Sequence, residues 1–134
     1  MAALAFLPGI FSIFYGDEAG LQGIHNLANR APFPWGKEDE DLLSYFRNML
    51  SIRESNEFLR TAECKIKDIN NRYFAYERLS KHNTALIIAS RSHYELEVDI
   101  PNEYQNAKVI FSVGGGTDLR KIAPYGVLIL KRTI

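Results

Sequence analysis

The chain opens with an apolar run over residues 10–15, which ends abruptly at a glycine and two carboxylates in "PGIFSIFYGDEAGLQG". A continuous run of β-branched and aromatic residues is typical of a strand buried on both faces, as in parallel α/β sheets. Ligands gather at the carboxyl ends of such strands. The pattern therefore predicts that Asp17 and Glu18 lie at the edge of a binding site.

A loop and a helix are predicted next. Residues 20–36 contain three glycines and two prolines and read as a loop. From residue 39 to residue 54, apolar side chains recur at helical spacing behind an acidic cluster, which favours a helix amino terminus. The strand, the loop and the helix make one β/α unit, which cannot close a sheet by itself.

Beyond Phe58 the pattern changes to short strands separated by turn-forming residues. The predicted strands cover residues 64–69, 72–79, 84–90, 95–100, 107–113, 118–122 and 125–131. So many strands without a helical period indicate an antiparallel β-sandwich, and we expect two parts, 1–58 and 59–134. The predicted core members of the sandwich are Phe74, Leu86, Ile88, Val98, Ile110, Val127 and Ile129.

Composition and charge narrow the function classes. Sixteen basic residues balance sixteen acidic ones without a basic block, which argues against nucleic acid as a partner. Cys64 is the only cysteine, so no disulfide can form within the chain. The apolar opening has no preceding Lys or Arg, and Pro8 and Gly9 interrupt it, so a buried strand is favoured over an export signal or a membrane span. The compartment stays undetermined, with the cytoplasm favoured.

The order of these segments carries a family resemblance. "PGIFSIFYGDEAGLQG" followed by "NRAPFPWG" resembles the α-amylase superfamily of glycoside hydrolases, within it the neopullulanase, cyclomaltodextrinase and maltogenic amylase branch. The resemblance implies that residues 10–15 are the eighth strand of a (β/α)8 barrel and that "SYFRNMLSIRESNEFLR" is its last helix and exit. "RYFAYERL", "TALIIASRS" and "APYGVLILKR" are similar to strands of the Greek-key sandwich called domain C. The expected fold is thus mainly β, a sandwich preceded by a β/α remnant of the barrel.

The resemblance also implies where the chemistry lies. Retaining glycoside hydrolysis needs two carboxyl groups about 5–5.5 Å apart. In this family they lie on earlier barrel strands, and the accompanying Asn-His-Asp segment is not in these 134 residues. Asp17 and Glu18 do not replace them, because neighbouring side chains of an extended chain point to opposite faces. We expect no catalytic residue, no cofactor and no metal ligand here, and no hydrolysis by this chain alone.

Five residues are candidates for lining a substrate site: Tyr15, Asp17, Glu18, Arg30 and Trp35. Trp35 lies in a proline-rich loop above the predicted strand end, where an aromatic ring can stack on a sugar. The alternative for the two carboxylates is that they brace the strand end.

The sequence departs from the family pattern around the arginine. Asn26, Leu27 and Ala28 stand where acidic residues are frequent, and Ala31 replaces a second arginine. These changes weaken the expectation that the loop contacts sugar as it does in close relatives.

Other signals favour ordinary structure. The glycine run 114–116 lacks a following Lys-Ser/Thr pair and predicts a hairpin turn rather than a phosphate cradle. His25, His82 and His93 are too widely spaced, with too few companions, for a metal site.

Two function classes remain open. The first is the C-terminal part of an α-glucan-hydrolysing enzyme, which reaches maltodextrin through the full-length protein and self-associates when its barrel remnant is exposed. The second is a self-sufficient β-sandwich module for carbohydrate binding or protein interaction. Glucan affinity of a protein translated natively from Met1 would favour the second.

Overall fold

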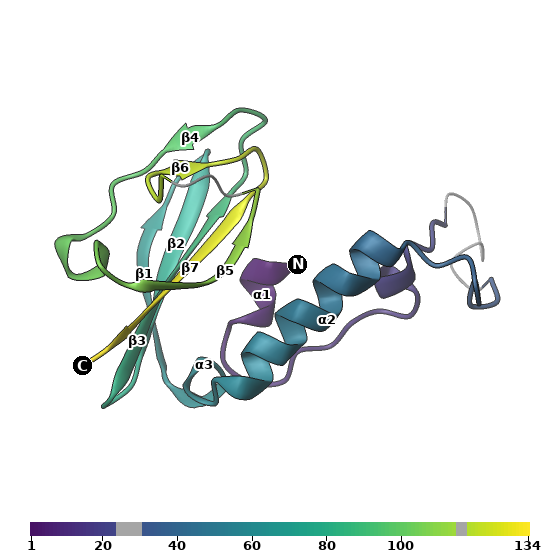
Figure 1. The fold of residues 1–134 in the computed structure, drawn as a ribbon, viewed down its shortest axis with the longest axis horizontal. Coiled ribbons are helices and arrows are strands. Elements are labelled where there is room, and N and C mark those ends of the chain that lie inside the picture. Colours follow the sequence, from purple (N-terminus) through teal and green to yellow (C-terminus); the bar gives the residue numbers. More distant parts are fainter. Residues whose placement is uncertain (24–30, 115–117) are drawn as a thin grey trace.

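The computed structural model describes residues 1–23, 31–114 and 118–134 and is built around one five-stranded antiparallel sheet (Figure 1). The strands lie in the order β1-β2-β3-β7-β5. Their bounds are β1 Glu63–Ile69, β2 Tyr73–Leu79, β3 Asn83–Ser90, β5 Lys108–Val113 and β7 Val127–Thr133. The first three strands follow one another through tight turns, whereas β7 lies between β3 and β5.

A second, small sheet covers one face of the large one. It pairs β4 (Leu96–Glu97) with β6 (Lys121–Ile122), and Val98 N donates a hydrogen bond to Arg120 O at 2.8 Å beside it. A 3₁₀ turn, η3 (Asn102–Tyr104), leads on to β5. The architecture is the predicted antiparallel Greek-key sandwich, although the strands expected over 95–100 and 118–122 form only two ladder residues each.

Alternation along the strands divides the core between the two faces of the large sheet. On β3, Ala85, Ile87 and Ala89 contribute to one cluster, with α-helical residues. Leu86 and Ile88 contribute to the other, with the small sheet. Successive side chains of a strand point to opposite faces, so a strand that is buried on both sides reads as a continuous apolar run.

The predicted core members are largely confirmed. Five are buried: Leu86, Ile88, Val98, Val127 and Ile129. Phe74 and Ile110 are partly buried and pack against the cluster on the helical side.

The predicted helix is confirmed as α2 (Glu40–Ser55). Asp39 is its N-cap, and its side chain accepts a hydrogen bond from Leu42 N at 2.9 Å, which satisfies an orphan donor of the first turn. Phe46 and Met49 are buried against the sheet side. Two short helices, α1 (Ala2–Ala5) and α3 (Phe58–Thr61), flank the same face, and α2 extends beyond the sheet as an arm (Figure 1).

The strand predicted over residues 10–15 is wrong for this chain. The segment runs without a ladder partner, and the side chains of Ile10 and Phe14 are 100% and 61% exposed. A strand needs at least one neighbouring strand for its ladder of backbone hydrogen bonds, and none of the described segments supplies one. Arg53 of α2 instead holds the chain just before it, donating to the carbonyls of Ala5, Leu7 and Gly9.

The two expected parts, 1–58 and 59–134, share a core rather than standing apart. The cluster on the helical face contains Phe6, Phe46 and Met49 from the first part and Ile87 and Ile129 from the second. The hydroxyl of Tyr76 on β2 also donates to Ala3 O at 2.6 Å. The boundary itself stays a prediction.

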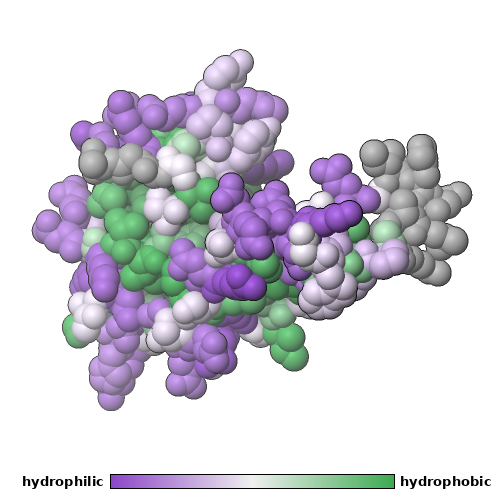
Figure 2. Space-filling view, turned by 45° about the vertical axis from the view of Figure 1, so that its right-hand side comes forward, coloured by the Kyte–Doolittle hydropathy of each residue, from purple (hydrophilic) through white to green (hydrophobic). Residues whose placement is uncertain are grey.

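No helix in the described ranges combines the length and apolar character needed to cross a bilayer. The hydropathy surface shows a continuous apolar area in the middle of one face of the molecule, bordered by hydrophilic residues (Figure 2). Among the residues described in the first part of the chain, the exposed large apolar side chains are Met1, Leu4, Ile10, Phe14, Tyr15, Trp35 and Leu50.

Candidate functional site

The two candidate carboxylates lie in a 3₁₀ turn, η1 (Asp17–Ala19), rather than at the end of an extended strand. Gly16 and Gly20 flank it with φ of 84° and 73°, a left-handed backbone that glycine adopts without steric cost. A Cβ on Gly16 would meet Leu21 Cβ at 2.7 Å, so this turn has no room for a side chain there. The abrupt end of the apolar run is therefore a tight turn.

The η1 turn is braced against the amino terminus of α2. Asp39 N donates to Ala19 O at 3.2 Å, and a Cβ on Gly20 would meet Asp39 Cβ at 3.2 Å. One carboxylate oxygen of Glu18, Oε2, is buried and has no hydrogen-bond partner among the described residues. An unpaired buried carboxylate oxygen is costly, so Glu18 does not stabilise the turn through that atom.

Two of the other candidates, Tyr15 and Trp35, are brought together by a third aromatic residue. The Tyr15 and Phe33 ring centroids lie 6.1 Å apart, and those of Phe33 and Trp35 lie 4.6 Å apart. The Tyr15 hydroxyl donates to Ala31 O at 3.1 Å, which ties the loop to the end of the apolar run. Phe33 was not among the predicted site residues, although its place in "PFPW" was the available signal. We call Tyr15, Phe33 and Trp35 the loop aromatic cluster.

The loop aromatic cluster can bind but carries no acid–base pair. Trp35 is 80% exposed, so its ring is available to stack on a ligand. Arg30, the remaining candidate, lies outside the described residues, as do His25 and most of the 114–116 glycine run. Across the ranges that are described, no group of three His, Cys, Asp or Glu side chains is arranged to hold a metal ion.

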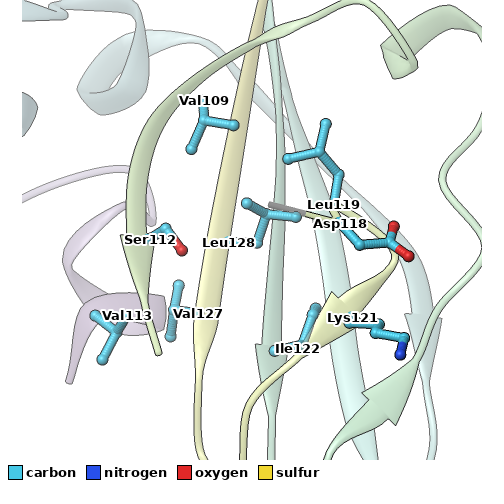
Figure 3. A pocket seen from close by; sticks show the side chains of 9 residues that line it. All are labelled: Val109, Ser112, Val113, Asp118, Leu119, Lys121, Ile122, Val127 and Leu128. Atoms are coloured by element: carbon cyan, nitrogen blue, oxygen red, sulfur yellow. The ribbon is translucent and has the colours of Figure 1, made fainter. Parts of the chain in front are cut away.

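The sandwich contains cavities that the loop aromatic cluster does not line. One of about 130 Å³ lies between β5, β7 and the β6 segment. Figure 3 shows mainly aliphatic side chains around it, with the carboxylate of Asp118 and the ammonium of Lys121 together at one side. Because the small sheet covers the large one with only two short strands, this cavity is explained by incomplete packing of the sandwich.

Sequence comparison connects the chain with known proteins. No protein-family model matches it. It is 42% identical over 71 residues to an amylopullulanase of Thermoanaerobacter thermohydrosulfuricus, a match covering 53% of this chain and 5% of that protein. It is 34% identical over 80 residues to a cyclomaltodextrinase of Bacillus sp, covering 57% of this chain and 14% of the relative. The chain thus spans only a small fraction of the curated relatives that it matches.

Structure comparison agrees on the fold. The cyclic α-maltosyl-(1→6)-maltose hydrolase of Arthrobacter globiformis matches with a TM-score of 0.77 and 21% identity, over 99% of this chain and 28% of that one. The α-amylase of H. orenii matches with a TM-score of 0.75 and 18% identity, over 98% of this chain and 34% of that one. The fold class is that of an amylase C-terminal sandwich with its preceding helix. In sequence the chain is thus similar to part of proteins named amylopullulanase and cyclomaltodextrinase, and in fold to part of an α-amylase.

Proposed function

We propose that this chain serves an α-glucan-acting glycoside hydrolase as its C-terminal part and does not itself supply the catalytic carboxylates. The observation that carries the proposal is the 42% identity over 71 residues to a protein named amylopullulanase, together with a fold match over nearly the whole chain to a protein named cyclic α-maltosyl-(1→6)-maltose hydrolase. Residues 1–58 then complete a (β/α)8 barrel, and residues 59–134 form the sandwich that follows it.

The exposed apolar surface supports a role as part of a larger unit. Ile10, Phe14 and Leu4 are more than half exposed, although side chains of this kind are usually buried. Other strands and helices of a barrel would cover them and would supply the backbone partners that residues 10–15 lack. In isolation these exposed apolar side chains favour self-association, because exposed apolar surface tends to be buried between molecules.

Substrate contact is proposed for the loop aromatic cluster. Trp35 and Tyr15 are positioned to stack on a glucose ring of maltodextrin, with Arg30 in the adjoining segment as a hydrogen-bond donor. The carboxylates Asp17 and Glu18 lie in the η1 turn that follows Tyr15, and they do not form an acid–base pair.

The test is hydrolysis by the purified chain. Maltodextrin, pullulan and cyclodextrin are each incubated with it, and released reducing ends are counted. No turnover is expected, because barrel chemistry draws its groups from several strand ends. Turnover that survives repurification and is lost in Asp17→Asn or Glu18→Gln would contradict the proposal, since those carboxylates would then be catalytic.

A further inference from the structure

One buried charge in the sandwich has no counter-charge. The side chain of Arg78 on β2 is completely buried, and none of the described residues forms a hydrogen bond with its Nε, Nη1 or Nη2 atoms. A guanidinium stays protonated in proteins, so this side chain cannot avoid the cost of burial by losing its charge. Buried charges are normally paired, and an unpaired one points to an ion or a water that completes it.

A second buried arginine, Arg53 of α2, shows how such a charge is usually satisfied. Its guanidinium donates to the backbone carbonyls of Ala5, Leu7 and Gly9. Arg78 is at least as well buried as Arg53 but has no such acceptor among the described residues. The two arginines therefore differ in their acceptors and not in their burial.

The chain itself offers no carboxylate for Arg78. The ion pairs between described side chains are Lys67–Glu77, Arg120–Asp118 and Lys121–Glu95. The remaining residues, 24–30 and 115–117, contain no Asp or Glu. A counter-charge for Arg78 must therefore come from outside these 134 residues.

The electrostatic surroundings of Arg78 are positive. Burial lowers the pKa of Arg53 from its ordinary value, and the like charges of Arg60 and Arg78 lower it further. Arg53 and Arg60 also line a hollow of about 320 Å³ between α2 and α3, together with Leu50 and Glu54. Three guanidinium groups thus outnumber the single carboxylate that lines this hollow, which gives ions from solvent access to two of them.

The position of Arg78 limits the size of the missing partner. Its neighbours on the adjacent strands, Cys64 of β1 and Ala85 of β3, are small. Arg78 lies one residue before the end of β2, where α3 packs against that strand (Figure 1). Because the guanidinium is completely covered, a large anion reaches it only by displacing these elements. A single-atom anion needs only a brief local opening.

We propose that Arg78 is the anchor of a small-anion site on the helical face of the sheet, which takes one monovalent anion of halide size. The N–H groups of the guanidinium donate charge-assisted hydrogen bonds to the anion. Arg53 and Arg60 favour its entry through their positive charge. The bound anion neutralises a buried charge and so stabilises the folded chain. The inference goes beyond the proposed function and does not depend on it, because no glucan chemistry enters.

The experiment is thermal unfolding of the full chain in sodium bromide, with sodium gluconate replacing bromide at constant ionic strength. The gluconate ion is too large to be enclosed beside Arg78. A ligand that binds only the folded state raises Tm as its concentration increases. Tm should therefore rise, and the rise should saturate, as bromide replaces gluconate.

Variants of Arg78 test whether the anion binds at this side chain. Arg78→Met should weaken the apparent affinity for bromide by about ten- to hundred-fold, so that the rise in Tm disappears over the same concentrations. Arg78→Lys keeps the charge but loses the planar fork, and should retain part of the rise. Arg72→Met is the matched control, since Arg72 is an exposed arginine next to the start of β2, and should leave the rise unchanged.

The Tm of Arg78→Met in gluconate alone is a separate check on its folding. It should equal or exceed that of the unmodified chain, because the variant buries no unpaired charge. An equal Tm of the unmodified chain in bromide and in gluconate would overturn the inference, since no such anion would bind. An undiminished rise in Arg78→Met, or a rise lost equally in Arg72→Met, would also overturn it. A lower Tm of Arg78→Met in gluconate would do the same, because the guanidinium would then already be paired within the folded chain.

Discussion

Truncating Ile88 to alanine should destabilise the sandwich by about 2–5 kcal/mol. Ile88 lies in the middle of β3, is 2% exposed and packs in the cluster beneath the small sheet. The substitution removes three carbon atoms, which at about 0.8 kcal/mol each account for about 2.4 kcal/mol of lost burial. The cavity left behind adds to this loss. A space of about 210 Å³ already adjoins Ile88, which indicates that its neighbours do not collapse to fill gaps.

The assay is urea unfolding followed by circular dichroism, with the midpoint and the slope fitted separately. The slope should stay constant, because the surface exposed on unfolding barely changes. Ile66→Ala is the matched control, since Ile66 lies on the edge strand β1 and is 65% exposed. Its effect should lie within about 0.5 kcal/mol. A loss below about 1 kcal/mol for Ile88→Ala would refute the assignment of β3 as the doubly buried centre of the sheet.

Three further predictions concern charge, pH and association. The side chain of Arg78 is completely buried, and none of the described residues forms a hydrogen bond with its guanidinium. Arg78→Met should therefore leave the free energy of unfolding unchanged or raise it by about 1–4 kcal/mol. A lower free energy in urea unfolding would reveal a partner of the guanidinium. Burial raises the pKa of Tyr76 above its ordinary value and that of Tyr104 to about 12, so the folded state keeps protons that the unfolded state releases near pH 10. Stability should therefore fall as pH rises from 10 to about 12, and Tyr76→Phe should flatten that fall; an unchanged pH slope would contradict this. Sedimentation velocity should show self-association that Phe14→Ser reduces, whereas a clean monomer of the unmodified chain would exclude association through this surface.

Much of the sandwich could be predicted because its signals are local. The run that contains Ile87 and Ile88 is apolar on both faces, and the structure places it at the centre of the large sheet. The helix α2 could equally be predicted from the sequence, because Asp39 marks its start and Phe46 and Met49 mark its buried face.

The features of the fold and the site that the sequence did not predict depend on contacts between distant segments. Residues 10–15 have the composition of a buried strand, but pairing requires neighbours that composition cannot supply. The alternation in residues 95–100 predicted a longer strand than β4, because the partner β6 is only two residues long. At the candidate site, the paired left-handed glycines Gly16 and Gly20 turned an expected strand end into a 3₁₀ turn. The Phe33 ring packs against those of both Tyr15 and Trp35, and no periodicity in the sequence indicates this contact between separated positions.

The most direct test of the central claim is the activity of a chimera. Residues 1–134 replace a segment of the Bacillus sp cyclomaltodextrinase that contains the 80-residue match and extends beyond it to the length of this chain, and release of reducing sugar from cyclodextrin is measured. The controls are the parent enzyme, the same enzyme lacking that segment, and a chimera carrying Ile88→Ala. If the chain is a C-terminal part of an α-glucan hydrolase, the chimera should hydrolyse cyclodextrin, the shortened enzyme should not, and Ile88→Ala should lower the temperature at which activity is lost. A chimera that folds to the parent's melting profile yet is no more active than the shortened enzyme would contradict the claim.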